Sequence, residues 1–410
     1  MDLLVSNARL RDGRLVGIGV DAGRIVSISD GQAPADALVV IDAFEGLVTE
    51  PFVNAHLHLD KVHTASLSGD AAITAYTADN MSEAAHSIDL AREVKRDYDP
   101  SWLIPNIRRA LVEAVRHGTL HILAFADVDT TAGLTGVAAV LEVREEFRDL
   151  LDLQVVAFPQ DGIVRDPGAA ELCEQAMELG ADVVGGIPWI ESTDADAEAH
   201  VEWACTLAAR LGTRVAMLTD DAGDPTLHTT RMFAEAMLRH GLHGRGVACH
   251  ARALALYPDT ELADLMELAA RAGLGFVSDP HTGPLALPVE RFDAAGLPVA
   301  LGQDDISDAY YPYGRNNLLE VAFLASHLLD LRTAPQRDRL IDLVTTSAAR
   351  VLGLDGYGLR VGGRADLCVH GARTTVDLLR SHDAPQWVIH SGRIAAQTVA
   401  RTAFGGPIAW

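Results

Sequence analysis

The first residues in the chain whose types and spacing suggest chemistry are two histidines, His56 and His58. They follow the apolar run Leu47–Asn54, which predicts a buried strand. Residues two apart in an extended backbone point to the same side, so both imidazoles can reach one ion. Imidazole is a ligand that suits zinc or iron(II). A single His-x-His pair is a weak signal, so the interpretation depends on where the other polar residues fall.

The middle of the chain repeats one plan, in which an amphipathic helical pattern ends near a glycine and a short apolar run follows. Glycine suits the left-handed cap of a helix. The further apolar runs are Leu120–Ala126, Leu153–Phe158, Val183–Ile187, Val215–Leu218, Val247–Cys249, Gly275–Ser278 and Val299–Leu301. Short, uniformly apolar strands are typical of a parallel sheet covered by helices. Together with Leu47–Asn54 they predict a (β/α)8 TIM barrel over residues 47–357.

The two ends of the chain have a different pattern. Residues 1–46 and 358–410 contain short alternating or apolar runs separated by turn residues, as at Asp12-Gly13. This pattern predicts a small antiparallel sheet at the amino end and a similar β-rich segment at the carboxyl end. We expect the two ends to pair into one small, discontinuous β-sandwich domain.

Polar side chains follow the carboxyl end of every predicted barrel strand. In chain order they are His56, His58, Asp60 and Lys61; Asp127 and Asp129; Gln160 and Asp161; Trp189 and Glu191; Asp220 and Asp221; His250; Asp279 and His281; and Gln303, Asp304 and Asp305. In a barrel of this kind the chemistry takes place at that rim. The pattern therefore predicts one active site built from all eight strands.

The chemistry that fits this rim is metal-assisted hydrolysis. His56, His58 and Asp304 can hold one divalent ion, zinc or iron, and leave a position open for water. Asp304 can also take the proton of that water, while His250 can hold the water or the developing oxyanion. Other interpretations remain open: His250 as a core histidine, Asp304 and Asp305 as a helix cap, and Gln160 and Glu191 as partners of backbone groups.

The composition of the chain indicates which classes of binding partner are unfavourable. The net charge of −24 argues against nucleic acid and anionic membranes, which would repel the chain. No apolar run is long enough to cross a bilayer, and the four cysteines are scattered. We expect a cytoplasmic protein with a small-molecule substrate, and homo-oligomerisation remains open.

Several collinear stretches resemble one family. They are Pro51–Asp60, Asp152–Ile163, Gly180–Pro188, Ala248–His250 and Gly302–Gly314. The chain resembles the amidohydrolase superfamily over nearly its whole length, and within it bacterial cytosine deaminase and the related triazine aminohydrolases. The resemblance implies that His56, His58 and Asp304 bind metal, that Asp304 shuttles protons and that His250 orients water. It also implies that Gln160 binds the amide edge of a ring.

The chain departs from this family at several positions. After strand five the family has a histidine that binds metal and a glutamate that donates a proton, where this chain has Leu218 and Asp221. Its Arg-Thr-His near strand two is replaced by Leu123-Ala-Phe125, which predicts an apolar wall. Of the nearby residues, Asp220, Asp221 or His281 could fill the ligand gap.

We therefore expect a metal-dependent hydrolase that cleaves a C–N bond of a small, cyclic nitrogenous substrate other than cytosine. The expected catalytic residues are Asp304, His250 and Asp221, and the expected substrate-binding residues are Gln160, Trp189, Glu191, Asp305 and Tyr310. Leu218 keeps two alternatives open. One is a barrel with a lost or weakened metal site that catalyses a lyase or isomerase step, and the other is a non-catalytic homologue.

Overall fold

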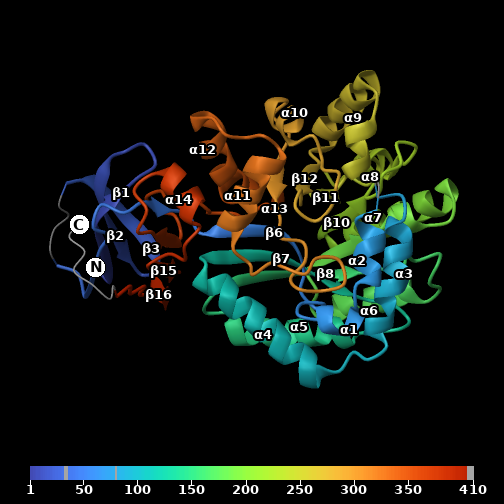
Figure 1. Cartoon of the computed structure of the whole chain (residues 1–410), viewed down its shortest axis with the longest axis horizontal. Coiled ribbons are helices and arrows are strands. Elements are labelled where there is room, and N and C mark those ends of the chain that lie inside the picture. Colours follow the sequence, from blue (N-terminus) through green and yellow to red (C-terminus); the bar gives the residue numbers. More distant parts are fainter. Residues whose placement is uncertain (32–35, 79–80, 404–410) are drawn as a thin grey trace.

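The computed structural model describes residues 1–31, 36–78 and 81–403. Its centre is an eight-stranded parallel sheet, which curls into a nearly closed barrel (Figure 1). The strands, in spatial and chain order, are β6 (Phe52–His58), β7 (Thr119–Asp127), β8 (Asp152–Phe158), β9 (Val183–Gly186), β10 (Arg214–Thr219), β11 (Gly246–His250), β12 (Gly275–Ser278) and β13 (Val299–Leu301). Each strand overlaps a predicted apolar run, so the predicted barrel is confirmed at this level.

The first strand and the segment after the last strand meet at the barrel seam. Asp304 and Leu57 form an isolated parallel bridge. The His58 amide donates to the Asp304 carbonyl at 2.8 Å, and the Asp304 amide donates to the His56 carbonyl at 2.9 Å. The backbone that joins the two edges of the sheet therefore belongs to the residues that the sequence predicts as metal ligands.

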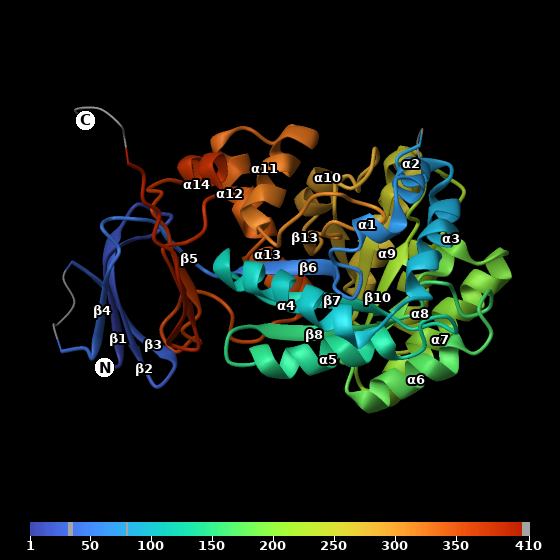
Figure 2. The ribbon, with the colours of Figure 1, turned by 60° about the horizontal axis from the view of Figure 1, so that its bottom comes forward.

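Helices surround the barrel (Figures 1 and 2). They are α1 (Ala65–Ser68), α2 (Ala71–Tyr76), α3 (Ala84–Lys95), α4 (Pro100–Arg116), α5 (Thr135–Phe147), α6 (Ala169–Leu179), α7 (Asp194–Leu211), α8 (Thr229–Arg239), α9 (Asp259–Ala272), α10 (Val289–Ala294), α11 (Leu318–Leu328), α12 (Ala334–Leu343) and α13 (Thr346–Leu352). Of these, α1, α2 and α3 lie beyond the carboxyl end of β6. Short 3-10 helices follow β9 (Pro188–Ile190) and β11 (Arg252–Leu256). Gly180, Gly212 and Gly273 end α6, α7 and α9 in the left-handed conformation, as the sequence predicts.

The chain ends form two four-stranded sheets that face each other beside the barrel (Figure 2). One contains β3 (Arg24–Asp30), β2 (Leu15–Asp21), β1 (Leu3–Arg9) and β4 (Val39–Asp42), in that order. The other contains β16 (Arg393–Gln397), β15 (Trp387–His390), β14 (Leu367–Val369) and β5 (Val48–Thr49), and α14 (Thr375–Ser381) lies between β14 and β15 in the chain. Both sheets contribute to one apolar cluster, which includes Val5, Ile18, Leu367 and Ile389.

Two details differ from the sequence-based prediction. The run Leu47–Asn54 is not one barrel strand, because Val48–Thr49 pairs with β14 in a terminal sheet and the barrel strand begins at Phe52. Pro51, which has no amide hydrogen, stands at this break. The amino-terminal sheet is also not wholly antiparallel, since β4 runs parallel to β1.

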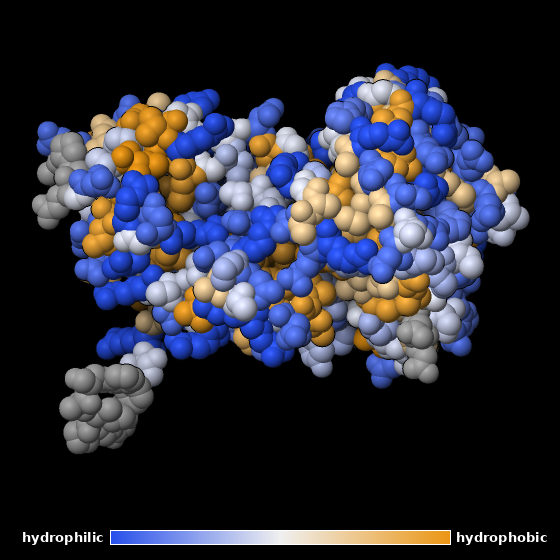
Figure 3. All heavy atoms as spheres, turned by 90° about the horizontal axis from the view of Figure 1, so that it is seen from above, coloured by the Kyte–Doolittle hydropathy of each residue, from blue (hydrophilic) through white to orange (hydrophobic). Residues whose placement is uncertain are grey.

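Polar residues cover much of the face in Figure 3, and apolar residues reach that surface in separate groups. In the terminal sheets the exposed apolar side chains include Val26, Val39 and Val40. Within the described ranges, no helix has both the length and the apolar character that a membrane crossing requires.

Asn54 ties the barrel seam together and provides a test of it. Its fully buried amide donates to the Asn316 side chain at 2.8 Å and accepts from the Gln303 amide at 3.0 Å. Asn54→Ala should lower the free energy of unfolding by about 1–3 kcal/mol, because it leaves buried partners unpaired. Denaturant titration measures this, with Asn106→Ala as the control: Asn106 is half-buried on α4 and makes no side-chain hydrogen bond in the described structure. Equal effects of the two substitutions would contradict the role assigned to Asn54.

Candidate active site

The centre of the candidate site is the buried carboxylate of Asp304, on which three imidazoles converge. Its Oδ1 lies 3.1 Å from Nε2 of His56, 3.7 Å from Nε2 of His58 and 3.7 Å from Nε2 of His250. Burial acts to raise the pKa of Asp304, but His250 and His56 outweigh it and hold that pKa well below its usual value. Asp304 is therefore a carboxylate at neutral pH.

The donor set has the features of a metal site. Ligand atoms of His56, His58 and Asp304 all lie within 4.8 Å of one another, and the three residues are buried. Neither ring nitrogen of His56, nor Oδ2 of Asp304, has a hydrogen-bond partner within the described ranges. Buried polar atoms are rarely left unpaired. Two imidazoles and a carboxylate fit zinc or iron(II), so the residues present fit one divalent ion.

Three strand-end residues adopt an uncommon backbone conformation. Asp220, His250 and Asp304 have φ angles of 48°, 65° and 63°. Residues other than glycine adopt such angles infrequently, at a cost of about 1–3 kcal/mol each, and they concentrate at functional sites. At His250 the turn is held by the Ala251 amide, which donates to the Thr219 carbonyl at 3.0 Å.

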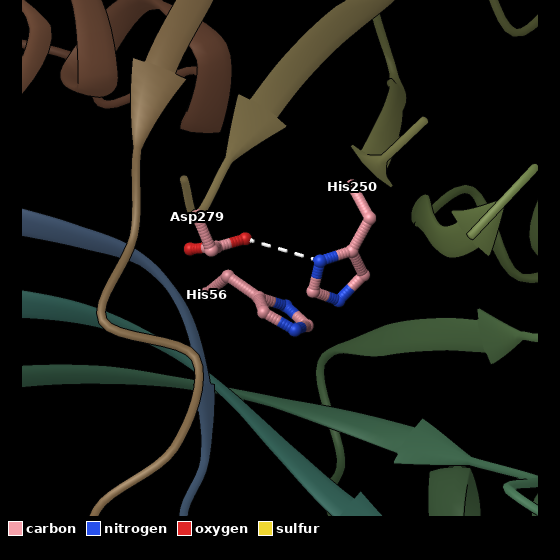
Figure 4. A group of neighbouring side chains, drawn as sticks. All are labelled: His56, His250 and Asp279. Carbon is pink, nitrogen blue, oxygen red and sulfur yellow. Dashed lines mark ion pairs between the residues drawn. The ribbon is translucent and has the colours of Figure 1, made fainter. Parts of the chain in front are cut away.

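His250 also contacts Asp279, the residue that follows β12. Its Nδ1 lies 3.4 Å from Oδ2 of Asp279, the pair joined by the dashed line in Figure 4. His56, His250 and Asp279 form a second group of three donors within 4.8 Å, which shares His56 with the first. Burial, followed by the negative charge of Asp304, raises the pKa of Asp279 well above its usual value.

Arg252 is fully buried beside these residues and pairs with Asp221. Its Nε donates to the Asp221 carboxylate at 2.7 Å, and its Nη2 donates to the hydroxyls of Thr282 at 2.7 Å and Tyr76 at 3.1 Å. Burial raises the pKa of Asp221 to about 7; Arg252 opposes this shift and Asp304 adds to it. Asp221 therefore stands in the site as a carboxyl that can carry a proton.

Lys61 lies beside Nδ1 of His58, the ring nitrogen that does not face Asp304. Its ammonium donates to Oε1 of Gln160, lies 3.0 Å from Asp127 and lies 3.4 Å from Nδ1 of His58. Burial acts to lower the pKa of Lys61, but Asp127 and Asp60 outweigh it and raise that pKa. Lys61 therefore remains a cation.

A narrow cavity opens onto this cluster. His58, Gln160, Trp189, Leu218, Asp221, His250, Asp304, Asp305, Tyr310, Tyr76, Ile88 and Ile187 line it. Phe125, which does not line the cavity, stacks edge-on against His56 with ring centroids 4.3 Å apart, so the residue that β7 places against His56 is apolar, as the sequence predicts. Leu218 lines the cavity at the position where the resembling family has a metal ligand.

The structure brings most of the predicted site residues together. Gln160, Trp189, Asp305 and Tyr310 line the cavity with the catalytic candidates. Glu191 does not line it. The Glu191 carboxylate instead accepts from the amides of residues 163–165 and lies 2.8 Å from Nδ1 of His200. Of the interpretations open for Glu191, the structure supports binding to backbone groups.

The three residues considered as substitutes for the missing ligand have different contacts in the structure. Asp220 accepts from Thr229 and Thr230 at the start of α8 and thus caps that helix. His281 lies 3.1 Å from the Gln303 carbonyl and belongs to none of the candidate metal groups. Asp221 remains at the cavity but is paired with Arg252.

Sequence reasoning assigned no role to Arg252, Tyr76, Lys61 or Asp279. Lys61 and Asp279 follow barrel strands, so the strand-end pattern contained their signal. Arg252 lies two residues beyond His250, and Tyr76 is in α2, far from any strand end. Their contacts become visible only in three dimensions.

Comparison with known proteins identifies the family of this chain and supports the fold. A sequence model of the amidohydrolase family matches residues 39–396, so the chain belongs to the amidohydrolase family. It is 30% identical to an N-isopropylammelide isopropyl amidohydrolase from a Pseudomonas species (strain ADP), over 95% of this chain and 93% of that one. It is 29% identical to a pterin deaminase from Rhizobium rhizogenes, over 89% and 84% of the two chains.

Among solved structures, a 5-methylcytosine deaminase from Klebsiella pneumoniae, liganded with 5-fluorocytosine, superposes with a TM-score of 0.89. The identity is 29%, and the match covers 98% of this chain and 99% of that one. The relatives are named amidohydrolases and deaminases. The expectation of a hydrolase acting on C–N bonds is therefore confirmed at the level of the family.

The contacts of Glu191 generate a prediction about stability. Glu191→Gln should lower the free energy of unfolding by about 1–3 kcal/mol, because the new amide nitrogen cannot accept from the backbone. Glu202→Gln is the matched control, since Glu202 pairs with Arg239 and His240 in a partly exposed position and should cost less than about 1 kcal/mol. Thermal or denaturant unfolding compares the two variants. A stable Glu191→Gln protein with weakened ligand binding would instead show that Glu191 contacts the substrate.

Proposed function

We propose that the protein is a metal-dependent hydrolase that cleaves a C–N bond of a small cyclic nitrogenous compound other than cytosine. One divalent ion, zinc or iron, would be held by His56, His58 and Asp304. The observation that carries the proposal is the convergence of these buried donors, with neither ring nitrogen of His56 in a hydrogen bond within the described ranges. The relatives support the substrate class, since their names refer to ammelide, pterin and methylcytosine.

The chain's own residues supply binding and proton transfer. A divalent ion, when bound, makes water more acidic and polarises the group under attack. Asp304, held as a carboxylate, accepts the proton of the attacking water. His250 lies 3.7 Å from Asp304 and 4.0 Å from Asp221, so it is placed to orient that water between them. Asp221, with its pKa raised to about 7, can donate a proton to the ring or the leaving nitrogen.

The substrate would lie between aromatic side chains. Tyr310 and Tyr76 stack edge-on with ring centroids 5.3 Å apart, and Trp189 lines the same cavity. Gln160 and Asp305 add polar groups to these walls. A small cavity that combines aromatic walls with several polar groups suits a flat heterocycle. Leu123 and Phe125 are buried apolar residues where the resemblance implies polar ones, which supports a substrate other than cytosine.

A second candidate function is a reaction without a hydrolytic metal, such as a lyase or isomerase step using the Asp and His residues as acids and bases. Leu218 and Lys61 favour it. Leucine cannot bind metal, and a cation 3.4 Å from Nδ1 of His58 opposes a second positive charge at Nε2 of that ring. Metal content separates the two candidates.

Metal content is the first test of the proposed function. Protein purified without chelator, or reconstituted with zinc or iron(II), should hold about one equivalent, because the three donors suffice for a catalytic site. His56→Asn should lower the affinity roughly tenfold or more, as loss of a direct ligand exceeds loss of a neighbouring contact. Elemental analysis gives the content, and His243→Asn, at an exposed histidine, is the control. Content below about a tenth of an equivalent after reconstitution would remove the metal from the proposal.

Position 218 supplies a second test. Leu218→His should strengthen metal retention, since Leu218 lines the cavity with His58 and Asp304 and a fourth donor completes the usual tetrahedral set. Competition with a metal-binding dye measures the dissociation constant. Weaker retention in the variant would show that the metal lies elsewhere than at His56, His58 and Asp304.

A further inference from the structure

The contact between Lys61 and Gln160 determines which way the Gln160 amide faces. An ammonium group has three donors and no acceptor, so it can only bind the oxygen of the amide. The structure places Oε1 of Gln160 against Nζ of Lys61. Asp127, 3.0 Å from the same Nζ, also holds the ammonium in place. Gln160 therefore presents its NH2 group, and not its carbonyl, away from Lys61.

The freed NH2 group lies at the wall of the active-site cavity. Nε2 of Gln160 is 3.4 Å from the Tyr310 hydroxyl, and both residues line the cavity. An amide NH2 has two hydrogens, of which the Tyr310 oxygen can take one. One Gln160 hydrogen remains for a ligand, and the Tyr310 hydroxyl has its own hydrogen to donate.

Trp189 adds an independent sign that a ligand belongs here. It lines the same cavity and is 8% exposed, and its indole Nε1 is buried without a hydrogen-bond partner within the described ranges. An indole nitrogen can only donate, and a buried donor without a partner is unfavourable. A hydrogen-bond acceptor on a bound ligand would satisfy it.

We propose that Lys61 is a positioning residue, which turns the Gln160 amide so that its NH2 group faces the cavity. Gln160, Tyr310 and Trp189 then form a donor wall, in which each side chain offers a hydrogen-bond donor. The substrate is accordingly a heterocycle that presents only acceptors on the edge facing this wall. Carbonyl oxygens or unprotonated ring nitrogens satisfy this wall. A ring edge that alternates an N–H donor with a carbonyl leaves donors opposed, so this inference departs from the amide edge that the resemblance implies for Gln160. This inference deepens the proposed function and rests on it for the location of the substrate.

Binding of two small neutral rings tests the inference without turnover. Pyridazine has two adjacent acceptors, whereas 2-pyridone has an adjacent N–H and carbonyl. The protein should bind pyridazine more tightly than 2-pyridone, as measured by titration calorimetry or ligand-observed NMR. In Lys61→Met the Gln160 amide is free to turn, and the preference should fall roughly tenfold, as expected for one hydrogen-bonding mismatch. Lys61→Arg, which keeps a donor-only cation, should retain most of the preference.

A double-mutant cycle shows whether Lys61 acts through Gln160. In a Gln160→Met background, Lys61→Met should leave the ratio of the two affinities unchanged. Loss of both affinities in equal proportion would indicate only a structural role for Lys61 and would overturn the inference. If Lys61→Met fails to fold, Gln160→Glu replaces it, because a carboxylate keeps the partner of Lys61 but has no donor; an unchanged preference there also overturns the inference.

The outcomes separate this inference from the proposed hydrolysis. Elemental analysis of the same samples reports the metal, and the affinity ratio reports the wall. A protein with normal metal content that prefers 2-pyridone refutes the donor wall alone. A protein without metal that still prefers pyridazine refutes the metal site and supports the wall.

Discussion

One buried carboxylate links the fold of this protein to its site. The Asp304 backbone joins the two edges of the barrel, with hydrogen bonds to His56 and His58, while its side chain draws three imidazoles together. The same residue adopts a left-handed conformation that costs free energy. Closing the barrel and assembling the site are therefore one event, and a change at this seam affects both stability and chemistry.

Leu218 and Phe125, two positions at which the sequence departs from the pattern of the family it resembles, belong to one buried apolar cluster. Leu218 removes a potential ligand, and Phe125 covers the neighbouring wall with an aromatic ring against His56. Arg252 pairs with Asp221, and its guanidinium lies 3.2 Å from Nδ1 of His250. The surroundings of His56 and His250 therefore combine apolar side chains with one buried guanidinium.

Much of this was predictable from the sequence, for a physical reason. Parallel strands that are buried on both faces must be uniformly apolar, so the eight barrel strands stand out, and their carboxyl ends identify the rim. His56, His58, His250 and Asp304 were found in this way. The break at Pro51 was missed because Val48 and Phe52 are both apolar, and pattern alone does not say which sheet receives each strand.

Other features depend on distance and not on order along the chain. Glu191 has the right type and position for substrate, but three backbone amides turn towards its carboxylate. Arg252 and Tyr76 are 176 residues apart in the sequence and yet in hydrogen-bond contact. The hydrophobic periodicity of a sequence does not predict a contact between residues so far apart. The polar network around Asp221 is therefore visible only in the structure.

The buried carboxyl groups of the site determine how strongly it attracts a metal ion. Four carboxyl groups, those of Asp221, Asp279, Asp304 and Asp305, are buried within one cluster, and Arg252 is the guanidinium among them. Burial and the charge of Asp304 together raise the pKa of Asp221, Asp279 and Asp305, so protons offset the excess negative charge when no other cation is near. A divalent ion would supply the same compensation and release those protons. Leu218 supplies no ligand where the resemblance implies a neutral histidine, but the four carboxyl groups of the cluster remain. They would therefore attract a divalent cation even with one coordinate bond fewer.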